Sequence, residues 1–393
     1  MPTRPCWVEI DTRALEANYR FLATLAAPHA ELLAIVKANA YGHSLDICAP
    51  AAMRAGARWL GVTSVEEGVA LRAACPDARV LVIGGVFPGQ GPDVLRHKLT
   101  PVVWEPNQLD ELEGAALAVD ARSLSIHLEI DTGMSRQGVD PDSLAQILAR
   151  FNRSSPLRLE GVMTHLFAAD EADGRVTDNQ LSLLDDVLVR IEAAGLHAGL
   201  LNVGNTAALL AGQANIISAL GARYGMKTLM RPGLALYGLV PQYDPQFESK
   251  EPQSLVEARR CLQPVMNWKS QVVSVRSIAE ETVVGYNGTF VATEPMRVAL
   301  VAVGYGDGLD RRLGNRFSLL VRGQHAPLVG RISMDQAVID VTDIAGVSAG
   351  DEVVILGSQG SETISAFDHA ATADTIPWEV FTRITARVLR VAV

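Results

Sequence analysis

The chain has 393 residues, of which 48% are hydrophobic and 20% charged, with a formal net charge of −10. This composition excludes wholesale disorder, and an acidic balance without a basic tract argues against binding to nucleic acid or to an anionic membrane. At about 150 residues per domain, the length predicts two domains, or one large barrel with a smaller domain. No apolar run approaches the roughly 18 residues that span a bilayer, and the N-terminus has no apolar signal segment, so we expect a cytoplasmic protein.

The cysteines are too dispersed to form a disulfide framework or a zinc cluster. They stand at positions 6, 48, 75 and 261 without a CxxC pair, and the eight histidines are dispersed in the same way. We therefore expect reduced thiols and no bound metal.

A short strand over residues 6–10 and a helix over 12–25 precede a regular alternation of apolar strands and amphipathic helices. The strands are expected at residues 32–38, 59–63, 79–84, 100–104, 124–130, 157–165, 200–203 and 227–231. The helices are expected at residues 44–55, 65–74, 93–99, 107–117, 142–151, 178–194 and 206–212. This alternation predicts a (βα)8 TIM-type barrel. An open doubly wound sheet is the alternative, but the first βα turn carries Lys37-Ala-Asn-Ala-Tyr-Gly instead of a dinucleotide-binding glycine fingerprint.

Beyond residue 240 the pattern changes to short strand-like segments separated by turn clusters. These segments are expected at residues 271–276, 282–284, 297–303, 318–321, 337–341 and 352–356, and a helical stretch over 378–385 precedes a last strand. We predict a barrel domain over residues 11–240 and a mainly antiparallel β domain over 241–393, which the strand over 1–10 joins.

Polar residues stand at the expected carboxyl ends of the barrel strands, where such barrels carry out their chemistry. They are Lys37, Glu129, Arg136, His165, Asn202, Asn205, Thr206 and Arg231. Taken singly, each has an ordinary structural explanation, such as a surface lysine, a core imidazole, a helix N-cap or an ion pair at the rim. Together they suit an anionic, planar cofactor, because Lys37 could bond covalently to an aldehyde and Thr206 could hold a phosphate at a helix N-terminus.

Several blocks, in order along nearly the whole chain, resemble the alanine racemase family. The first, Ala34-Ile-Val-Lys-Ala-Asn-Ala-Tyr-Gly-His43, is similar to that family's pyridoxal-phosphate lysine motif. The others are His127-Leu-Glu-Ile-Asp-Thr-Gly-Met-Ser-Arg136, Met163-Thr-His165, Arg231-Pro-Gly-Leu-Ala-Leu-Tyr-Gly238, Gly285-Tyr-Asn-Gly288, Gly304-Tyr-Gly-Asp-Gly308 and Val329-Gly-Arg-Ile-Ser-Met-Asp-Gln336. The resemblance implies a pyridoxal 5′-phosphate barrel, a C-terminal β domain and a head-to-tail homodimer.

The resemblance also implies a role for each residue in these blocks. Lys37 would hold the cofactor's aldehyde at rest and then serve as one of two bases, with Tyr286 of the partner subunit as the opposite base. Arg136 and the backbone N–H of Met334 of the partner subunit would bind the substrate carboxylate. The remaining cofactor-binding residues would be Tyr41, His165, Asn205, Thr206, Arg231, Gly233 and Leu234. The residues at the entrance would be Tyr305 and Asp335.

Three positions depart from the family's pattern. Glu129 stands where many relatives have a lysine that becomes carbamylated, so a permanent carboxylate takes the place of the carbamate near Arg136. Asn202 stands where histidine is often found behind Arg231, and it can still accept a hydrogen bond from that guanidinium. Ala386 stands where many relatives have a tyrosine, which predicts one fewer phosphate contact and a wider entrance.

The expected function is that of an alanine racemase, which interconverts L- and D-alanine and supplies D-alanine for peptidoglycan. A racemase for serine, or for a broader range of amino acids, would use the same two bases. A decarboxylase of basic amino acids shares the domain plan, but the blocks around Tyr286 and Met334 match racemases instead. A non-catalytic pyridoxal-phosphate carrier would resemble the barrel alone.

Overall fold

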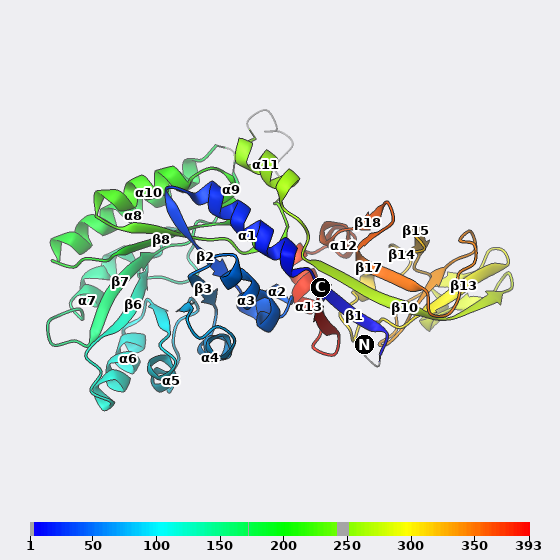
Figure 1. Cartoon of the computed structure of the whole chain (residues 1–393), viewed down its shortest axis with the longest axis horizontal. Helices are drawn as coiled ribbons and strands as arrows, with labels where there is room; N and C mark the ends of the chain where they lie inside the picture. The colour runs from blue at the N-terminus through cyan, green and yellow to red at the C-terminus, as the bar shows by residue number, and fades with distance from the viewer. Residues whose placement is uncertain (1–3, 172, 242–250) are drawn as a thin grey trace. The chain divides into compact units, whose positions relative to one another are not determined.

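The computed structural model describes residues 4–171, 173–241 and 251–393. The chain forms two compact units. The first, termed the barrel unit, comprises Arg13–Ala40 and Cys48–Gln263, and the second, termed the β unit, comprises Met1–Thr12, Tyr41–Ile47 and Pro264–Val393. Figure 1 shows the elements of both units.

Eight parallel strands close into a barrel in the first unit. They are β2 (Ala30–Ile35), β3 (Trp59–Val62), β4 (Arg79–Val82), β5 (Thr100–Val103), β6 (Leu124–Glu129), β7 (Leu157–Met163), β8 (Leu200–Asn205) and β9 (Lys227–Arg231). The last strand pairs with the first, with Ala30 opposite Thr228. The predicted (βα)8 barrel is therefore confirmed, and the open doubly wound sheet is excluded.

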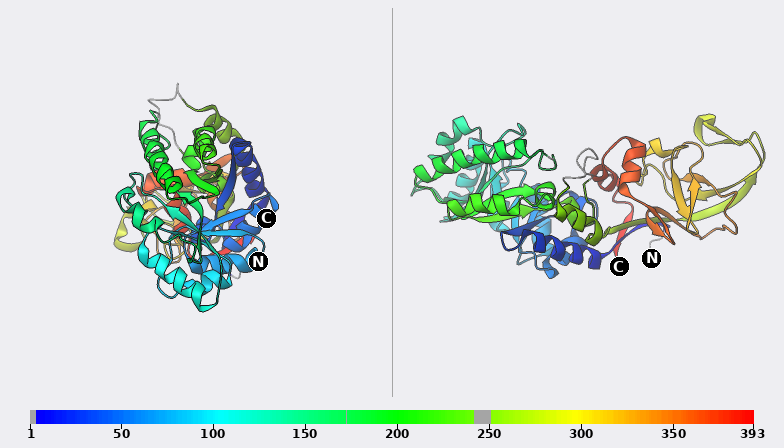
Figure 2. Two further views of the ribbon diagram at one scale, coloured as in Figure 1. Left: turned by 90° about the vertical axis from the view of Figure 1, so that its left-hand side faces the viewer. Right: turned by 90° about the horizontal axis from the view of Figure 1, so that it is seen from above.

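The helices of the barrel unit lie outside its strands (Figure 1, Figure 2). In chain order the helices are α1 (Thr12–Ala26), α3 (Leu45–Arg54), α4 (Val65–Ala74), α5 (Gly91–Arg96), α6 (Pro106–Ala118), α7 (Leu144–Leu148), α8 (Arg175–Ala193), α9 (Thr206–Leu210), α10 (Ala214–Arg223) and α11 (Gln253–Cys261). No element was predicted for α11, which follows residues 242–250, outside the described residues. The expected domain boundary after residue 240 falls beside those same residues. Among the described residues, no helix combines the length and apolar character needed to cross a bilayer.

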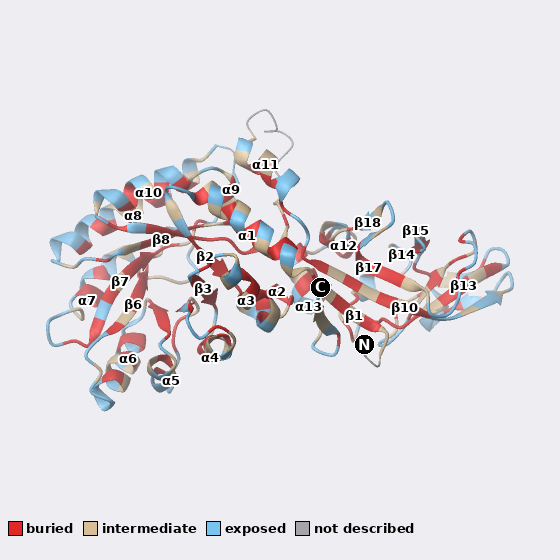
Figure 3. Ribbon diagram, in the orientation of Figure 1, coloured by how far each residue is buried: buried red, intermediate tan, exposed pale blue. Residues whose placement is uncertain are grey.

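The barrel core is formed by strands that are buried on both faces. Every residue of β3 and β5 is buried. Strand β3 is red throughout in Figure 3. Gly61 on β3 has no room for a side chain, because an added Cβ would lie 2.5 Å from the Leu33 side chain and 2.6 Å from that of Ile35. Apolar runs without alternation are typical of parallel sheets covered by helices, and this explains why these strands could be predicted from the sequence.

The β unit contains a nine-stranded sheet, with β15–β14–β17–β10–β1–β19 as its main order. Its strands are β1 (Cys6–Ile10), β10 (Met266–Ile278), β13 (Met296–Val301), β14 (Ser318–Val321), β15 (Gln324–Pro327), β16 (Ala337–Asp340), β17 (Glu352–Gln359), β18 (Glu362–Ile364) and β19 (Leu389–Ala392). A separate hairpin pairs β11 (Val283–Val284) with β12 (Phe290–Val291). All pairs are antiparallel except β1 with β19, so the predicted mainly antiparallel domain is confirmed.

Several elements of the β unit differ from the sequence prediction, which contains no strand for β12, β15 or β18. Strand β10 begins at Met266 and not at residue 271, and its first seven residues alternate between buried and half-buried positions. Helix α12 (Ala366–Ala373) was not predicted, although its start carries a recognisable signal. The Ser365 hydroxyl accepts the Asp368 N–H at 3.2 Å, and an Asp368 carboxylate oxygen accepts the Ser365 N–H at 2.7 Å. This reciprocal cap stabilises the first turn of the helix. Helix α13 (Pro377–Arg383) precedes the last strand.

Candidate active site

Lys37 stands just beyond the carboxyl end of β2, where the backbone turns left-handed. The strand predicted over residues 32–38 ends at Ile35, and the φ angles of residues 38–41 are 51°, 54°, 56° and 53°. Without a glycine, such a conformation costs about 1–2 kcal/mol per residue. Glu67 on α4 opposes this cost, because its carboxylate accepts the Ala38 N–H at 2.7 Å and the Thr63 N–H at 2.8 Å.

The amine of Lys37 is half-buried in a cationic environment. Burial lowers the pKa of Lys37, and the nearby guanidinium groups of Arg136 and Arg231 lower it further, whereas Glu67 opposes them. A lysine with a lowered pKa has a larger neutral fraction near neutral pH, which is the form that acts as a nucleophile or a base.

Arg231 ends β9 and is buried among hydrogen-bond acceptors. Its Nη1 donates to the backbone oxygen and the side-chain oxygen of Asn202, at 2.6 and 2.7 Å. Its Nη2 donates to the Thr164 carbonyl at 2.8 Å and to Nδ1 of His165 at 3.1 Å. Burial lowers the pKa of Arg231 to about 10, against the attraction of Glu129, so the guanidinium stays charged at neutral pH.

His165 is held as a neutral imidazole. Burial lowers the pKa of His165 to about 3, and the charges of Arg231, Arg136 and Lys37 act in the same direction. A guanidinium has only donors, so Nδ1 of His165 is the acceptor and the ring proton stands on Nε2.

Glu129 and Arg136 lie near each other at the end of β6 without a direct hydrogen bond between them in the described part of the chain. The Glu129 carboxylate accepts a hydrogen bond from Nε2 of Gln137 at 2.6 Å, and the sequence pattern predicts no role for this glutamine.

The loop that carries Arg136 is shaped by Asp131, whose carboxylate accepts the N–H groups of Gly133 and Ser135 at 2.9 and 3.1 Å. Arg136 itself is exposed and has no hydrogen bond or ion pair to other described residues. Its guanidinium is therefore available to a carboxylate from outside the chain.

The ends of β8 and β9 are joined through Thr206. Asn205 caps α9, since its side-chain oxygen accepts the Ala208 N–H at 3.1 Å. The hydroxyl oxygen of Thr206 accepts the Gly233 N–H at 3.0 Å, immediately before the 3-10 helix η2 (Leu234–Tyr237). The hydroxyl proton of Thr206 and the backbone that begins η2 provide donors suited to an anionic oxygen.

The other predicted site residues belong to the β unit. Tyr286, Met334 and Tyr305 are exposed, at 66%, 52% and 42% of their surface. Backbone hydrogen bonds hold two of their loops together, from Tyr305 N–H to the Ser333 carbonyl at 3.0 Å and from Gly306 N–H to the Met334 carbonyl at 2.8 Å. The last two predicted residues of this unit are Asp335, which pairs with Arg387 at 2.7 Å, and the buried Tyr41, whose pKa burial raises to about 12.

Asp307 organises these loops, although the sequence pattern predicts no such role for it. It is fully buried, and it accepts hydrogen bonds from Arg4, from Arg387 at 2.7 Å and from the Gly304 N–H at 2.8 Å. Burial by itself would raise the pKa of Asp307, but the hydrogen bonds from Arg4 and Arg387 lower it. The only sequence signal was the aspartate among the glycines of Gly304-Tyr-Gly-Asp-Gly308.

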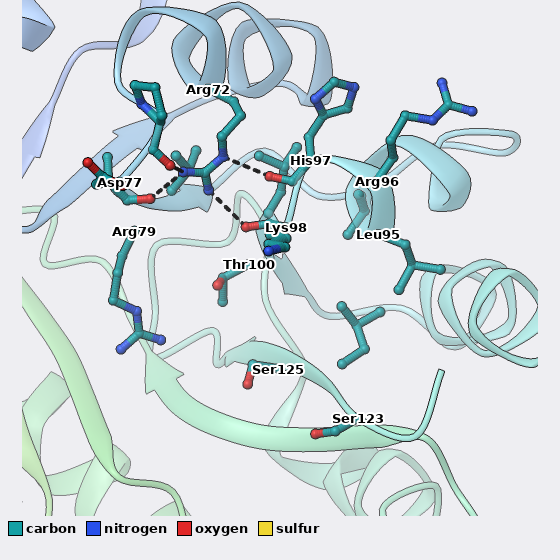
Figure 4. Close-up of a pocket in the computed structure, with 16 residues that line it drawn as sticks. Arg72, Asp77, Arg79, Leu95, Arg96, His97, Lys98, Thr100, Ser123 and Ser125 are labelled. Atoms are coloured by element: carbon teal, nitrogen blue, oxygen red, sulfur yellow. Dashed lines mark hydrogen bonds between the residues drawn. The ribbon is translucent and has the colours of Figure 1, made fainter. Parts of the chain in front are cut away.

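A cavity of about 580 Å³ lies at the starts of β4, β5 and β6, at the end of the barrel opposite Lys37. Figure 4 shows the side chains that line it. The Arg72 side chain donates to the carbonyls of Pro76, Ala78, His97 and Lys98, at 2.7, 2.7, 2.9 and 3.0 Å. Its donors are thus used to tie two loops together, as expected for the stabilising end of such a barrel. Among the described residues, no cluster of three or more His, Cys, Asp or Glu side chains could hold a metal ion.

Comparison with known proteins gives one consistent result. Residues 10–241 match the family model described as alanine racemase, N-terminal domain, and residues 265–392 match alanine racemase, C-terminal domain. The alanine racemase of Symbiobacterium thermophilum is 38% identical over 390 residues, which cover 98% of this chain and 97% of that protein. Among solved structures, the Bacillus anthracis alanine racemase with bound L-Ala-P has a TM-score of 0.87 and 30% identity, covering 100% of this chain and 96% of the other. The Bartonella henselae alanine racemase with covalently bound pyridoxal phosphate has a TM-score of 0.81 and 27% identity, with 100% of both chains covered.

Proposed function

This chain belongs to the alanine racemase family, and we propose that it interconverts L- and D-alanine with pyridoxal 5′-phosphate as its cofactor. The observation that carries the proposal is the group of cations at the carboxyl end of the barrel. There burial lowers the pKa of the Lys37 amine, and the positive charges of Arg136 and Arg231 lower it further. An amine with a lowered pKa among fixed positive charges fits an anionic aldehyde.

The residues at this end of the barrel fit that group. Lys37 would bond to its aldehyde, Arg231 and the neutral His165 would hold its ring, and the hydroxyl of Thr206 would hold its phosphate. The further phosphate-binding residues would be Tyr41, Asn205, Gly233 and Leu234. When bound, pyridoxal phosphate withdraws electron density from the α-carbon of the substrate and so makes its hydrogen acidic.

The chain itself supplies the proton transfers. Nζ of Lys37 takes the proton from one face of the α-carbon or returns it there, because its lowered pKa makes the neutral amine accessible. The phenol oxygen of Tyr286 of the partner subunit does the same on the opposite face. A proton removed on one face and returned on the other inverts the centre.

Two charged side chains orient the reactants. Arg136, exposed and without a described partner, binds the substrate carboxylate together with the backbone N–H of Met334 of the partner subunit. Arg231 has only donors and stays charged, so it holds the ring nitrogen without taking up or releasing a proton. Glu129 and Asn202 support these two arginines, while Tyr305 and Asp335 line the entrance.

The active site is then shared between two subunits, and the functional form is a homodimer. Tyr286 and Met334 are exposed in the β unit, which supports a role at an interface. Light scattering coupled to an activity assay tests this, since a monomer with full activity would contradict it. The D-alanine produced would supply peptidoglycan precursors in the cytoplasm.

The proposed activity is tested by following exchange of the α-proton in D2O by proton NMR, with a chiral readout. L-alanine, L-serine, L-lysine and L-glutamate are each tested with added pyridoxal phosphate, and Tyr286→Phe and Lys37→Ala serve as controls. We expect exchange and inversion of alanine, lost in both variants. Turnover of serine or of the whole panel would assign a racemase of broader specificity. Cofactor bound through Lys37 without exchange of any substrate would contradict the proposal.

A further inference from the structure

The side-chain amide of Gln137 lies between two acceptors at the edge of the barrel. Its Nε2 donates to Oε2 of Glu129 at 2.6 Å and to the carbonyl of Ile83, just beyond β4, at 3.2 Å. Both neighbours accept hydrogen bonds, so only the nitrogen of the amide can face them. The orientation of Gln137 is therefore fixed from both sides.

Glu129 depends on this hydrogen bond because it is buried. Only 2% of its surface is exposed, and a buried carboxylate is costly unless hydrogen bonds or opposite charges compensate it. The charged groups that act on it are Arg231 on β9, and Arg136 and Asp131 on the loop after β6. Burial raises the pKa of Glu129 above its ordinary value and Asp131 adds to this, whereas the hydrogen bond from Gln137 and the two arginines limit the rise.

We propose that Gln137 is a positioning residue that holds the Glu129 carboxylate in its ionised form, and in a fixed orientation, as the counter-charge of Arg231 and Arg136. The Ile83 carbonyl anchors the amide to the barrel, and the amide anchors the carboxylate. Through this chain of contacts the end of β4 determines the electrostatic environment of the two arginines. The consequence for substrate binding rests on the proposed function, in which Arg136 binds the substrate carboxylate.

The first test measures the stability of the protein without cofactor, and so does not depend on catalysis. Urea unfolding is measured at pH 5 and pH 8.5 for the natural chain, Gln137→Met, Glu129→Gln and the double variant. We expect the loss of stability in Gln137→Met to be larger at pH 8.5, because the ionised carboxylate loses its donor there. In the Glu129→Gln background, the effect of Gln137→Met should be the same at both pH values. A pH-independent loss in both backgrounds would overturn the proposal.

Two further variants separate hydrogen bonding from packing. Gln137→Lys places an ammonium group, which has only donors, opposite the same two acceptors, so it should retain most of the stability at pH 8.5. Equal losses in Gln137→Lys and Gln137→Met would overturn the proposal. Gln108→Met is the matched control, because within the described parts of the chain the Gln108 side-chain oxygen accepts only backbone N–H groups, those of Trp104 and Glu105 at 2.8 and 3.0 Å. Its cost should not change between the two pH values.

The second test uses the holoenzyme. Gln137→Met should raise KM for alanine by about tenfold and change kcat much less, because Arg136 loses its oriented counter-charge while Lys37 and Tyr286 are untouched. A loss confined to kcat would contradict the positioning role. If alanine is not a substrate at all, the proposed function fails, and the pH-dependent coupling between Gln137 and Glu129 in the cofactor-free protein still decides this inference.

Discussion

Arg231 donates from a single nitrogen to both oxygens of Asn202, the backbone carbonyl at 2.6 Å and the side-chain amide at 2.7 Å. Asn202 is fully buried, and its Nδ2 has no hydrogen-bond partner among the described residues. The asparagine is therefore fixed through its oxygen, while its amide nitrogen remains an unsatisfied buried donor.

Two substitutions at position 202 should separate these effects. In Asn202→Leu the guanidinium loses a charged hydrogen bond, so we expect the free energy of unfolding to fall by roughly 1–3 kcal/mol. In Asn202→Asp the unpartnered amide NH2 group is removed and a carboxylate faces Arg231. The free energy of unfolding should therefore fall by less than in Asn202→Leu. Urea unfolding of the cofactor-free protein at pH 7.5 compares the two. Equal stability of Asn202→Leu and the natural chain would show that the side-chain contact contributes nothing.

The reactivity of the Lys37 amine should change in opposite directions when a neighbouring charge is removed. Arg136→Met removes a positive charge and should raise the pKa of Lys37, whereas Glu67→Gln removes a negative charge and should lower it. The rate of acylation of Lys37 in the cofactor-free protein, followed by mass spectrometry between pH 6 and pH 10, reports the neutral fraction. The acylation profile should move to higher pH in Arg136→Met and to lower pH in Glu67→Gln.

The acylation of Lys269 provides the internal reference for this experiment. Lys269 belongs to the β unit and pairs with Glu9 and Glu352, at 3.0 and 3.1 Å. Its profile should stay the same in all three proteins. If both variants moved the Lys37 profile in the same direction, a change of conformation would be responsible and not the charge.

Activity should not depend on added bicarbonate. A carbamate forms reversibly from carbon dioxide, whereas the Glu129 carboxylate is permanent and is held by Gln137 at 2.6 Å. Initial rates in carbon-dioxide-depleted buffer, with and without bicarbonate, should therefore agree. Stimulation by bicarbonate would show that Glu129 does not take over the role of a carbamylated lysine.

The Asp307 cluster should make the β unit more stable at neutral than at acidic pH. Its hydrogen bonds with Arg4 and Arg387 lower the pKa of Asp307 although burial would raise it. A lowered carboxyl pKa contributes stability that is present above the unfolded-state pKa of about 4 and is lost as the pH falls through the folded-state value. We expect Asp307→Asn to cost roughly 2–4 kcal/mol at pH 7 and progressively less below pH 4 in urea unfolding.

An exposed ion pair serves as the control for Asp307. Asp93 and Arg96 lie 3.3 Å apart at the surface of the barrel unit, and such pairs contribute little. Asp93→Asn should therefore leave the pH dependence of stability nearly unchanged. If Asp307→Asn behaved in the same way, the cluster would have no electrostatic role in stability.

Two glycines should respond oppositely to substitution by alanine. A Cβ at Gly161 on β7 would lie 2.5 Å from the buried ring of His127, so Gly161→Ala should lower the free energy of unfolding by roughly 1–3 kcal/mol. Gly114 in α6 has no atom within 4 Å of the added Cβ, so Gly114→Ala should raise it by roughly 0.5–1 kcal/mol. Thermal unfolding of the two variants distinguishes these effects, and stabilisation by Gly161→Ala would contradict the packing of the barrel interior.

The barrel could be predicted from the amino-acid sequence, because the signal for each of its elements is local. Each strand is an apolar run and each helix has its own amphipathic period, so the eight units could be counted before the barrel was seen to close. The residues at which the strands end could be predicted less accurately, because they depend on contacts that are not local. The strand before Lys37 ends at Ile35 because a left-handed turn follows, and that turn is held by Glu67 on α4, the helix after the next strand.

The contacts between polar groups could not be predicted in this way, because they depend on how the chain folds. Gln137 reaches Glu129 and Ile83 because strands β4 and β6 both end at the same rim of the closed barrel. Asp307 joins Arg4 and Arg387, which lie 303 and 80 residues away along the chain, because β1 and β19 pair in the same sheet. Hydrophobic periodicity is a property of residues that are close together in the sequence. The partners of a buried charge depend on strands brought together from distant parts of the chain.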